Sequence, residues 1–224
     1  MPPAPPAETS VTARYRKGDE ARGRILESAL AAFGADGFKG ATTRQIAEEA
    51  GVSLPALRYY FGGKEGLYLA CAQEIVDRYG QRLLSPIAGA WTALPPDPSP
   101  EAARAALKTV LGALAELLVG TREAEVWTGF VLREMAEPGP AFDILYGQVW
   151  APGVDLIARL IGWILPDRPT EAVRIEAFLL VSSLTSFSIV RPVALKYLAW
   201  SDAGGERLAA VRRVIDGQVD RLSP

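Results

Sequence analysis

The side chains best placed for chemistry form a short group of hydrogen-bond donors and small apolar groups between positions 53 and 59. Val52, Leu57 and Phe61 recur at helical spacing and define an inward, apolar face. The outward set is Ser53, Leu54, Pro55, Arg58 and Tyr59. A guanidinium and hydroxyls beside small apolar groups suit the edges of base pairs, where the same face can meet donors, acceptors and thymine methyl groups.

The residues around this set predict the helices that position it. Thr42 and Thr43 supply hydroxyls for a helix N-terminus, where backbone N–H groups lack partners. Gly51 then ends that helix at little conformational cost, Ser53 caps the next, and Pro55 falls in its first turn, where a missing N–H is harmless. Two short helices joined by a tight glycine turn make a helix-turn-helix.

Other polar side chains near these helices suit the phosphate backbone of a duplex. Free N–H groups at a helix N-terminus attract anions, so hydroxyls and amines placed there reinforce the attraction. The phosphate candidates are Thr43, Tyr60 and Lys64, and Arg44 and Gln45 are placed to touch backbone or base edges. Arg58 suits two roles, a paired contact with guanine or a contact with phosphate, and the sequence does not choose between them.

The segment from Thr42 to Leu67 resembles the DNA-binding signature of the TetR/AcrR family of bacterial transcriptional repressors. The positions in register are Ile46, Ala47, Ala50, Gly51, Val52, Ser53, Leu57, Tyr60, Phe61, Gly63, Lys64, Glu65 and Leu67. Arg58 departs from the pattern, since a tyrosine is usual there. A second resemblance joins Arg133–Ile144 and Leu145–Leu165 to the C-terminal region of a TetR subset that includes CecR-type regulators.

This resemblance implies an all-α protein with an N-terminal helix-turn-helix head and a C-terminal body for ligand binding and dimerisation. It also implies a homodimer that binds palindromic double-stranded operator DNA and is released by a small-molecule effector. In such proteins the last pair of long helices forms the dimer interface, and the matching pair here is Pro152–Leu165 and Thr170–Val190. Packing within one subunit is the alternative for these two helices. Repression is the expected outcome of binding, with activation as the alternative.

Composition excludes several classes of site. The chain has 224 residues, 49% of them hydrophobic and 22% charged, with no histidine and one cysteine, Cys71. A disulfide within the chain, a His/Cys zinc site and a histidine-based triad are therefore excluded, and no phosphate-binding glycine loop is present. We expect no cofactor, no metal, no enzymatic activity and a reducing cytoplasm, with Cys71 as a small core residue. The alternatives are an enzyme with an appended helical head and a helical protein-interaction module.

Charge is distributed unevenly along the chain. The net charge is −2, but the segment from Arg14 to Lys64 holds nine Lys/Arg against six Asp/Glu. A basic front end on an acidic body suits a protein that meets DNA at one end. Residues 1–18 are expected to be a disordered arm, whose Arg14, Arg16 and Lys17 serve either as a solubilising tail or as a minor-groove contact.

Breaks in the helical pattern predict the domain organisation: a helix-turn-helix domain over residues 19–66 and a helical body over 67–224. The first helix is expected from Asp19 to Ala35 and another from Lys64 to before Pro86, followed by a loop over Ala93–Pro100. The remaining helices are expected over Pro100–Val119, Glu123–Ala136, Gly139–Trp150, Pro152–Leu165, Thr170–Val190 and from Gly205 to before Ser223. The most apolar run, Ala177–Val190, is too short for a membrane span, and no membrane partner is expected.

The body carries an aromatic set that, taken together, suggests an apolar effector cavity. For any single member, core packing is the competing explanation. The candidate ligand residues are Trp127, Phe130, Arg133, Glu134, Met135, Phe142, Tyr146 and Phe178. The sequence shows no cluster of arginines beyond the head, so we expect an apolar or aromatic effector rather than a phosphorylated metabolite or a metal ion.

Overall fold

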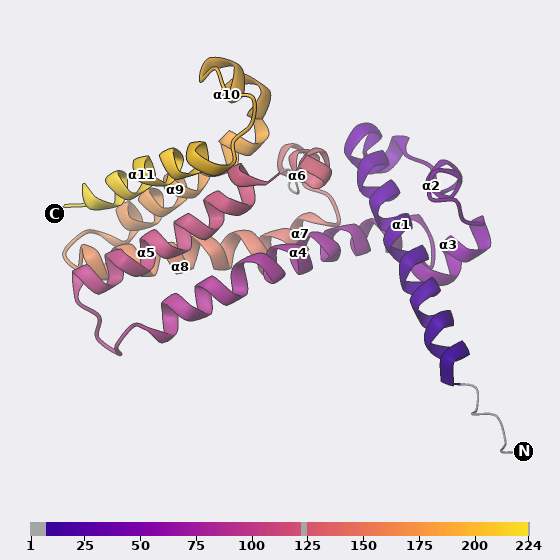
Figure 1. The fold of residues 1–224 in the computed structure, drawn as a ribbon, viewed down its shortest axis with the longest axis horizontal. Coiled ribbons are helices and arrows are strands. Elements are labelled where there is room, and N and C mark those ends of the chain that lie inside the picture. The colour runs from indigo at the N-terminus through magenta and orange to yellow at the C-terminus, as the bar shows by residue number, and fades with distance from the viewer. Residues whose placement is uncertain (1–7, 122–124, 224) are drawn as a thin grey trace, which may run out of the picture. The chain divides into compact units, whose positions relative to one another are not determined.

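The structure is a computed structural model that describes residues 8–121 and 125–223, with side chains described from residue 18 onward except at residue 125. All regular secondary structure in this part of the chain is helical (Figure 1), as predicted. The described residues fall into two compact units. The first, here called the head, comprises the chain up to Glu74 together with the segment Gly129–Ala141. The second, the body, comprises Ile75–Thr128 and the chain from Phe142 onward.

The head is built from α1 (Glu8–Gly40), α2 (Thr43–Glu49), α3 (Leu54–Phe61) and the first turns of α4 (Lys64–Thr92). An apolar stripe along α1 forms the core of the head. The fully buried members are Ile25, Leu26, Ala29, Leu30 and Phe33, joined by Ile46, Leu57, Leu67 and Cys71 from the other helices. Leu67 and Cys71 of α4 are buried in this core, so the compact unit extends past residue 66, the domain boundary predicted from the sequence.

The first helix is longer than the sequence predicted. It begins at Glu8 rather than near Asp19, so residues 8–18 are helical rather than a disordered arm. No proline or glycine lies between Glu8 and Lys17 to interrupt a helical backbone, whereas residues 1–7 of the predicted arm lie outside the described residues. Gly37 has φ 71° and leaves the helical conformation within α1, two residues after the predicted end of the first helix at Ala35.

The body is a set of packed helices (Figure 1). It contains α5 (Pro100–Ala115), the π-helical turn η1 (Glu116–Gly120), α7 (Phe142–Leu145), the π-helical turn η2 (Tyr146–Trp150), α8 (Ala151–Ile164), α9 (Thr170–Ile189), α10 (Arg191–Tyr197) and α11 (Gly205–Asp220). The helix α6 (Glu125–Ala136) has residues in both units. Within the body α8 packs against α5 and α9, and α11 packs against α5.

Two elements of the body differ from the prediction. α4 continues through Pro86 to Thr92 instead of stopping before the proline. The cost is one backbone hydrogen bond, because proline has no N–H to donate to the carbonyl four residues earlier. The short α10 was not predicted. Its first residue, Arg191, is buried and donates from Nη1 to the carbonyl oxygens of Val119 at 2.8 Å and Thr121 at 3.4 Å. These bonds give hydrogen-bond partners to carbonyl groups at the C-terminal end of η1.

Candidate DNA-binding surface and effector grooves

The two helices of the predicted helix-turn-helix begin at the expected caps. The Thr42 hydroxyl accepts from the Gln45 N–H at 3.2 Å and starts α2, and the Ser53 hydroxyl accepts from the Ala56 N–H at 3.3 Å and starts α3. Between them Gly51 has φ 65°, a left-handed conformation that a side chain would strain. Each cap satisfies a backbone donor that would otherwise lack a partner, so the turn holds α3 in one orientation.

The predicted outward face of α3 is exposed. Ser53, Pro55 and Arg58 are exposed, Leu54 is half-buried, and Tyr59 is 85% exposed. Leu57, from the opposite face, is fully buried against the rest of the head. Among the described residues the guanidinium of Arg58 has no side-chain partner, so its donors are available to a ligand.

The side chains predicted to contact phosphate differ in how many of their polar groups already have partners within the head. Thr43 is half-buried at the first position of α2, and Arg44 lies beside it, paired with Glu48 at 3.1 Å. Both partners of that pair are largely exposed, and such pairs are worth only about 0–1 kcal/mol, so a phosphate can compete for the arginine. Gln45 donates from Nε2 to the Glu49 carboxylate at 3.2 Å.

Lys64 and Tyr60 are more firmly placed. The Lys64 ammonium donates to the Lys39 carbonyl at 3.3 Å and lies 5.0 Å from the centroid of the Phe38 ring. One of its three donors is therefore used inside the head. Tyr60 is half-buried and meets the Tyr59 ring edge-on, with 5.4 Å between centroids. The side chains of Arg14, Arg16 and Lys17 lie outside the described residues, so the role of the arm stays a prediction.

The segment Gly129–Ala136 of α6 packs within the head, which the sequence did not indicate. A Cβ placed on Gly129 would lie 3.2 Å from the Gly34 Cα, so the backbones of α1 and α6 approach closely through two glycines. Arg133 donates from Nε to the Gly34 carbonyl at 2.8 Å and from Nη2 to the Ala35 carbonyl. These bonds satisfy carbonyls next to the break at Gly37 and fix α6 to the end of that helical segment.

A buried polar contact adds to this attachment. Glu134 is 2% exposed; its carboxylate accepts from the Tyr68 hydroxyl at 2.5 Å and from the Gly139 N–H at 3.3 Å. Burial, and secondly this bond to Glu134, raises the pKa of Tyr68 above its usual range. Phe130 packs on the same tyrosine, with 4.7 Å between ring centroids. Phe130, Arg133 and Glu134, predicted to bind an effector, thus all make contacts within the head, and their role towards an effector stays a prediction.

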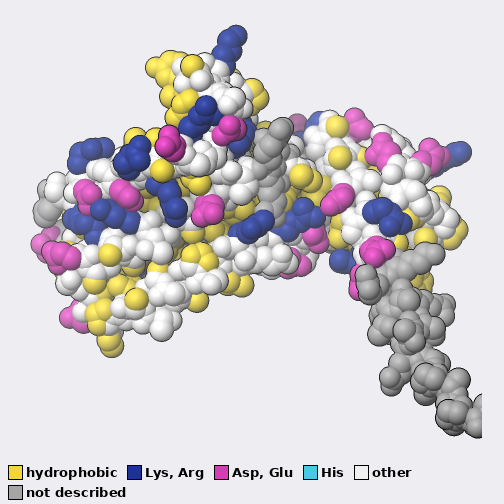
Figure 2. All heavy atoms as spheres, in the orientation of Figure 1, with side chains coloured by type: hydrophobic (Ala, Val, Ile, Leu, Met, Phe, Trp, Pro, Cys, Tyr) yellow, Lys and Arg dark blue, Asp and Glu magenta, His cyan; other side chains and the backbone are white. Residues whose placement is uncertain are grey.

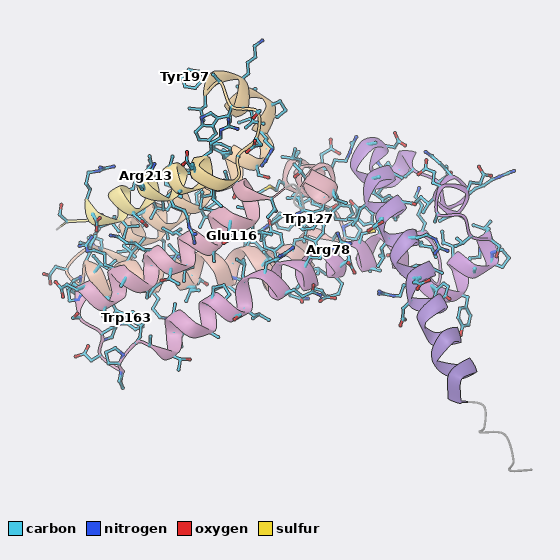
Figure 3. The ribbon with its side chains drawn as sticks, viewed as in Figure 1. Arg78, Glu116, Trp127, Trp163, Tyr197 and Arg213 are labelled. Carbon is cyan, nitrogen blue, oxygen red and sulfur yellow. The ribbon has the colours of Figure 1, made fainter. Side chains whose placement is uncertain are left out.

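The other predicted effector residues are dispersed. Met135 is 45% exposed on the head segment of α6. Trp127 is 1% exposed in the body, where the Arg78 guanidinium lies 5.6 Å from its ring centroid; the two side chains are labelled in Figure 3. Core packing, the competing explanation for Trp127, holds for this residue.

The last predicted effector residues are Phe142, Tyr146 and Phe178, and they too lie apart from the two grooves described below. Phe142 stacks on Tyr146 at 5.8 Å and meets Trp150 edge-on at 5.5 Å, while Tyr146 is 52% exposed. Phe178 is 61% exposed on α9. The predicted aromatic residues therefore do not line the two grooves described below, and an aromatic effector cavity stays a prediction. Helical spacing indicates which side chains share one face of a helix. Which of these side chains line a cavity depends on the other helices that pack against that face.

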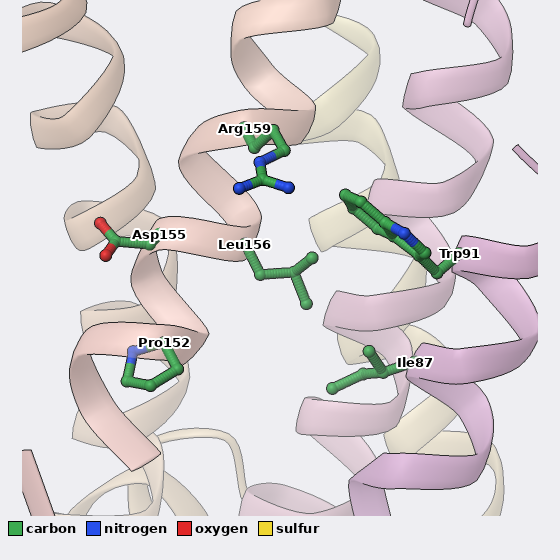
Figure 4. Close-up of a pocket in the computed structure, with 6 residues that line it drawn as sticks. All are labelled: Ile87, Trp91, Pro152, Asp155, Leu156 and Arg159. Carbon is green, nitrogen blue, oxygen red and sulfur yellow. The ribbon is translucent and has the colours of Figure 1, made fainter. Parts of the chain in front are cut away.

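The body instead carries two adjoining grooves along α8. The first, of about 290 Å³, is lined by Ile87, Trp91, Pro152, Asp155, Leu156 and Arg159. Figure 4 shows Leu156 and Arg159 extending from α8 towards Ile87 and Trp91 of α4, with Asp155 directed away from Trp91. The second, of about 510 Å³, is lined by Asp155, Ala158, Arg159, Gly162, Leu165, Pro166, Arg168, Thr170, Val173 and Arg174.

The second groove corrects the expectation that arginines do not cluster beyond the head. Arg159, Arg168 and Arg174 line it together. They come from α8, from the loop that follows it and from α9, so no run of basic residues marks the cluster in the sequence. The part of the chain that the structure describes holds no group of three or more His, Cys, Asp or Glu side chains suited to a metal ion.

Comparison with known proteins agrees with these features. Residues 25–71 match the family described as bacterial regulatory proteins, tetR family, and residues 103–223 match the C-terminal domain of the HTH-type transcriptional dual regulator CecR. The chain is 31% identical to the CecR regulator of Shigella flexneri over 210 residues, which is 92% of each protein. The chain belongs to the TetR family. It is a DNA-binding transcriptional regulator with a CecR-type C-terminal domain, and it is not an enzyme.

Relatives within the TetR family extend this placement. The chain is 51% identical to the RutR regulator of Escherichia coli (strain K12) over 53 residues, 24% of this chain and 25% of RutR. Among solved structures, AibR in complex with isovaleryl coenzyme A and operator DNA matches with a TM-score of 0.60 and 18% identity over 89% of this chain and 96% of that one. FadR from Bacillus subtilis in complex with stearoyl-CoA matches with a TM-score of 0.59 and 14% identity, over 90% and 98%. Identities this low show a shared fold.

Proposed function

We propose that this TetR-family protein is a ligand-responsive repressor that binds a palindromic operator as a homodimer and leaves it when a small effector binds. The observation that carries the proposal is the exposed donor face of α3, held between two capped turns. Binding of chromosomal DNA also makes the cytoplasm its place of action.

On DNA, the N-terminal part of α3 enters the major groove, as the second helix of such motifs does. Ser53, Leu54 and Pro55 then face base edges, and the unpartnered Arg58 guanidinium reaches either a guanine or a phosphate. A paired contact with guanine is worth about 1–3 kcal/mol in discrimination. Arg44 and Lys64, whose present contacts are exposed, bind the backbone on either side.

One helix-turn-helix reads a half-site, so a palindrome requires a second copy. The body leaves a suitable surface, since Ile175, Phe178 and Leu179 of α9 are 53%, 61% and 59% exposed. Val193 and Tyr197 of α10, which packs against α9, are 66% and 87% exposed, and Figure 2 shows apolar side chains gathered on the surface of α10. Burial of this face in a dimer removes large apolar groups from water. We name it the α9–α10 face.

The same helix could be taken for a membrane span. α9 is long and apolar enough by length and composition, but a single such helix is weak evidence. Its start carries Glu171, Arg174 and Glu176, and it packs on α8 along its other side. A dimer interface accounts for both its apolar composition and its partial exposure, so we propose no membrane partner.

The effector presents apolar or aromatic surface to the body. The AibR and B. subtilis FadR structures each contain an acyl-coenzyme A, so an acyl group is one form that such surface takes. α4 and α6 each contribute residues to both the head and the body. These two continuous helices are therefore suited to transmit a change in the body to the spacing of the two heads of the dimer.

The experiment that tests the proposal is selection of bound fragments from genomic DNA by the purified protein. The expected result is a short palindromic motif. Its enrichment should fall with Arg58→Ala and stay unchanged with Arg213→Ala, a variant of an exposed arginine on α11 (Figure 3). Recovery of no enriched sequence, while the protein is folded, would favour the alternative of a protein-interaction module and refute the proposal.

A further inference from the structure

The two grooves of the body adjoin along α8, where Asp155 and Arg159 line both, and together they make one candidate site. We call it the α8 trough. Its two ends differ in chemistry, apolar where α8 faces α4 and basic where α8 faces the start of α9. None of the residues predicted from sequence to bind an effector lines either groove.

At the apolar end, Ile87 and Trp91 of α4 face Leu156 of α8 (Figure 4). The Arg159 guanidinium lies 5.4 Å from the Trp91 ring centroid, and Trp163 lies 5.6 Å from the same ring. A hydrocarbon chain or ring placed here would lose contact with water on several sides, which is the usual source of affinity in small-molecule sites.

At the basic end, the lining residues include three arginines and one carboxylate, that of Asp155. Arg168 is paired with Glu176 at 3.3 Å, while Arg174 is exposed and has no side-chain partner among the described residues. The first turn of α9 also begins here, with Thr170 in the lining and no side-chain cap on its N–H groups. Guanidinium groups and free helix N–H groups both bind oxyanions.

The size of the trough fits a small molecule. Its two grooves, of about 290 and 510 Å³, are comparable with the ~300–1,000 Å³ typical of ligand pockets. A ligand that satisfies both ends must be amphipathic. An apolar compound would leave the Arg174 guanidinium without a partner, and a small inorganic anion would leave the apolar end empty.

We propose that the α8 trough binds an amphipathic anion, with its hydrocarbon part against Ile87, Trp91 and Leu156 and its phosphate or carboxylate group at Arg159, Arg168 and Arg174. This inference rests on the proposed function in one respect, that the ligand acts as the effector. It refines the apolar effector expected from the sequence by adding an anionic group.

The test is calorimetric titration of the full-length protein with octyl phosphate, octanoate, octanol and inorganic pyrophosphate. Octyl phosphate or octanoate should bind at least tenfold more tightly than octanol or pyrophosphate, and the tighter of the two identifies the anionic group. Arg174→Gln should weaken that binding about fivefold or more without lowering the melting temperature, since the side chain is exposed and unpartnered. Arg213→Gln, a matched change outside the trough, should leave binding unchanged.

Equal affinity for octanol and the anionic compounds, or an Arg174→Gln protein that binds like the wild type, would overturn the assignment. A gel-shift assay on operator DNA separates this result from the proposed function. Loss of operator binding on addition of the tighter anion supports the effector role, while binding that leaves operator affinity unchanged contradicts that role. A wild type that binds the anion but no DNA refutes the proposed function and leaves the ligand site standing.

Discussion

Removal of the Tyr68 hydroxyl tests how α6 is held in the head. Tyr68→Phe leaves the ring in place but takes one of two hydrogen bonds from the Glu134 carboxylate, which is 2% exposed. Hydrogen bonds to charged groups contribute about 1.5–3 kcal/mol. At about 2–4 °C per kcal/mol for a chain of this size, the melting temperature should fall by roughly 3–12 °C. Thermal and urea unfolding measure this directly.

A double-mutant cycle isolates the pair. In a Glu134→Met background the carboxylate is absent, so Tyr68→Phe no longer removes a hydrogen bond to it. The loss in unfolding free energy caused by Tyr68→Phe should therefore be smaller than in the wild type, by most of the energy of that hydrogen bond. Tyr59→Phe, at a tyrosine that is 85% exposed, is the matched control and should change stability by less than about 0.5 kcal/mol. An equal loss in both backgrounds, or no loss in the wild type, would show that the short contact does not attach α6 to the head.

Three further predictions concern other parts of the molecule. Arg58→Ala should weaken operator binding by about 1–3 kcal/mol without unfolding the protein. Competition with variant operators then distinguishes two contacts: relaxed specificity at one position per half-site indicates a base contact, and equal weakening for all sequences indicates a phosphate contact. Phe178→Asp should give folded monomers in sedimentation, whereas Val214→Asp, at an equally exposed residue of α11, should leave the dimer intact; a dimeric Phe178→Asp protein contradicts the α9–α10 face. Burial raises the pKa of the Cys71 thiol and raises that of Tyr79 to about 12, so the unfolded chain, with ordinary values of 9.0 and 10.0, loses these protons first. The free energy of unfolding should then fall as pH rises above about 9, and a flat profile from pH 8 to 11 would count against this burial.

Local chemistry was enough to predict the two capped helices, the turn between them and the exposed face of α3. Thr42, Gly51 and Ser53 each act through backbone groups a few residues away, so the sequence indicates the turn and the capped helices directly. The exposed position of Arg58 follows from helical periodicity once Leu57 faces inward.

The rest depended on long-range contacts. The approach of Gly34 to Gly129 and the bond from Tyr68 to Glu134 join residues 95 and 66 positions apart, and periodicity carries no information about such pairs. The arginines of the α8 trough are likewise brought together by the packing of α8 on α9. Aromatic spacing therefore did not indicate the trough, whose lining contains none of the predicted effector residues.

The most direct test of the central claim is the salt dependence of binding to the selected operator duplex. If the homodimer neutralises roughly eight phosphates, the logarithm of its association constant should fall with the logarithm of the salt concentration, with a slope of about −7. The same duplex with both half-sites scrambled should bind far more weakly at each salt concentration. A flat salt response, or equal affinity for the intact and scrambled duplexes, would contradict operator recognition by α3.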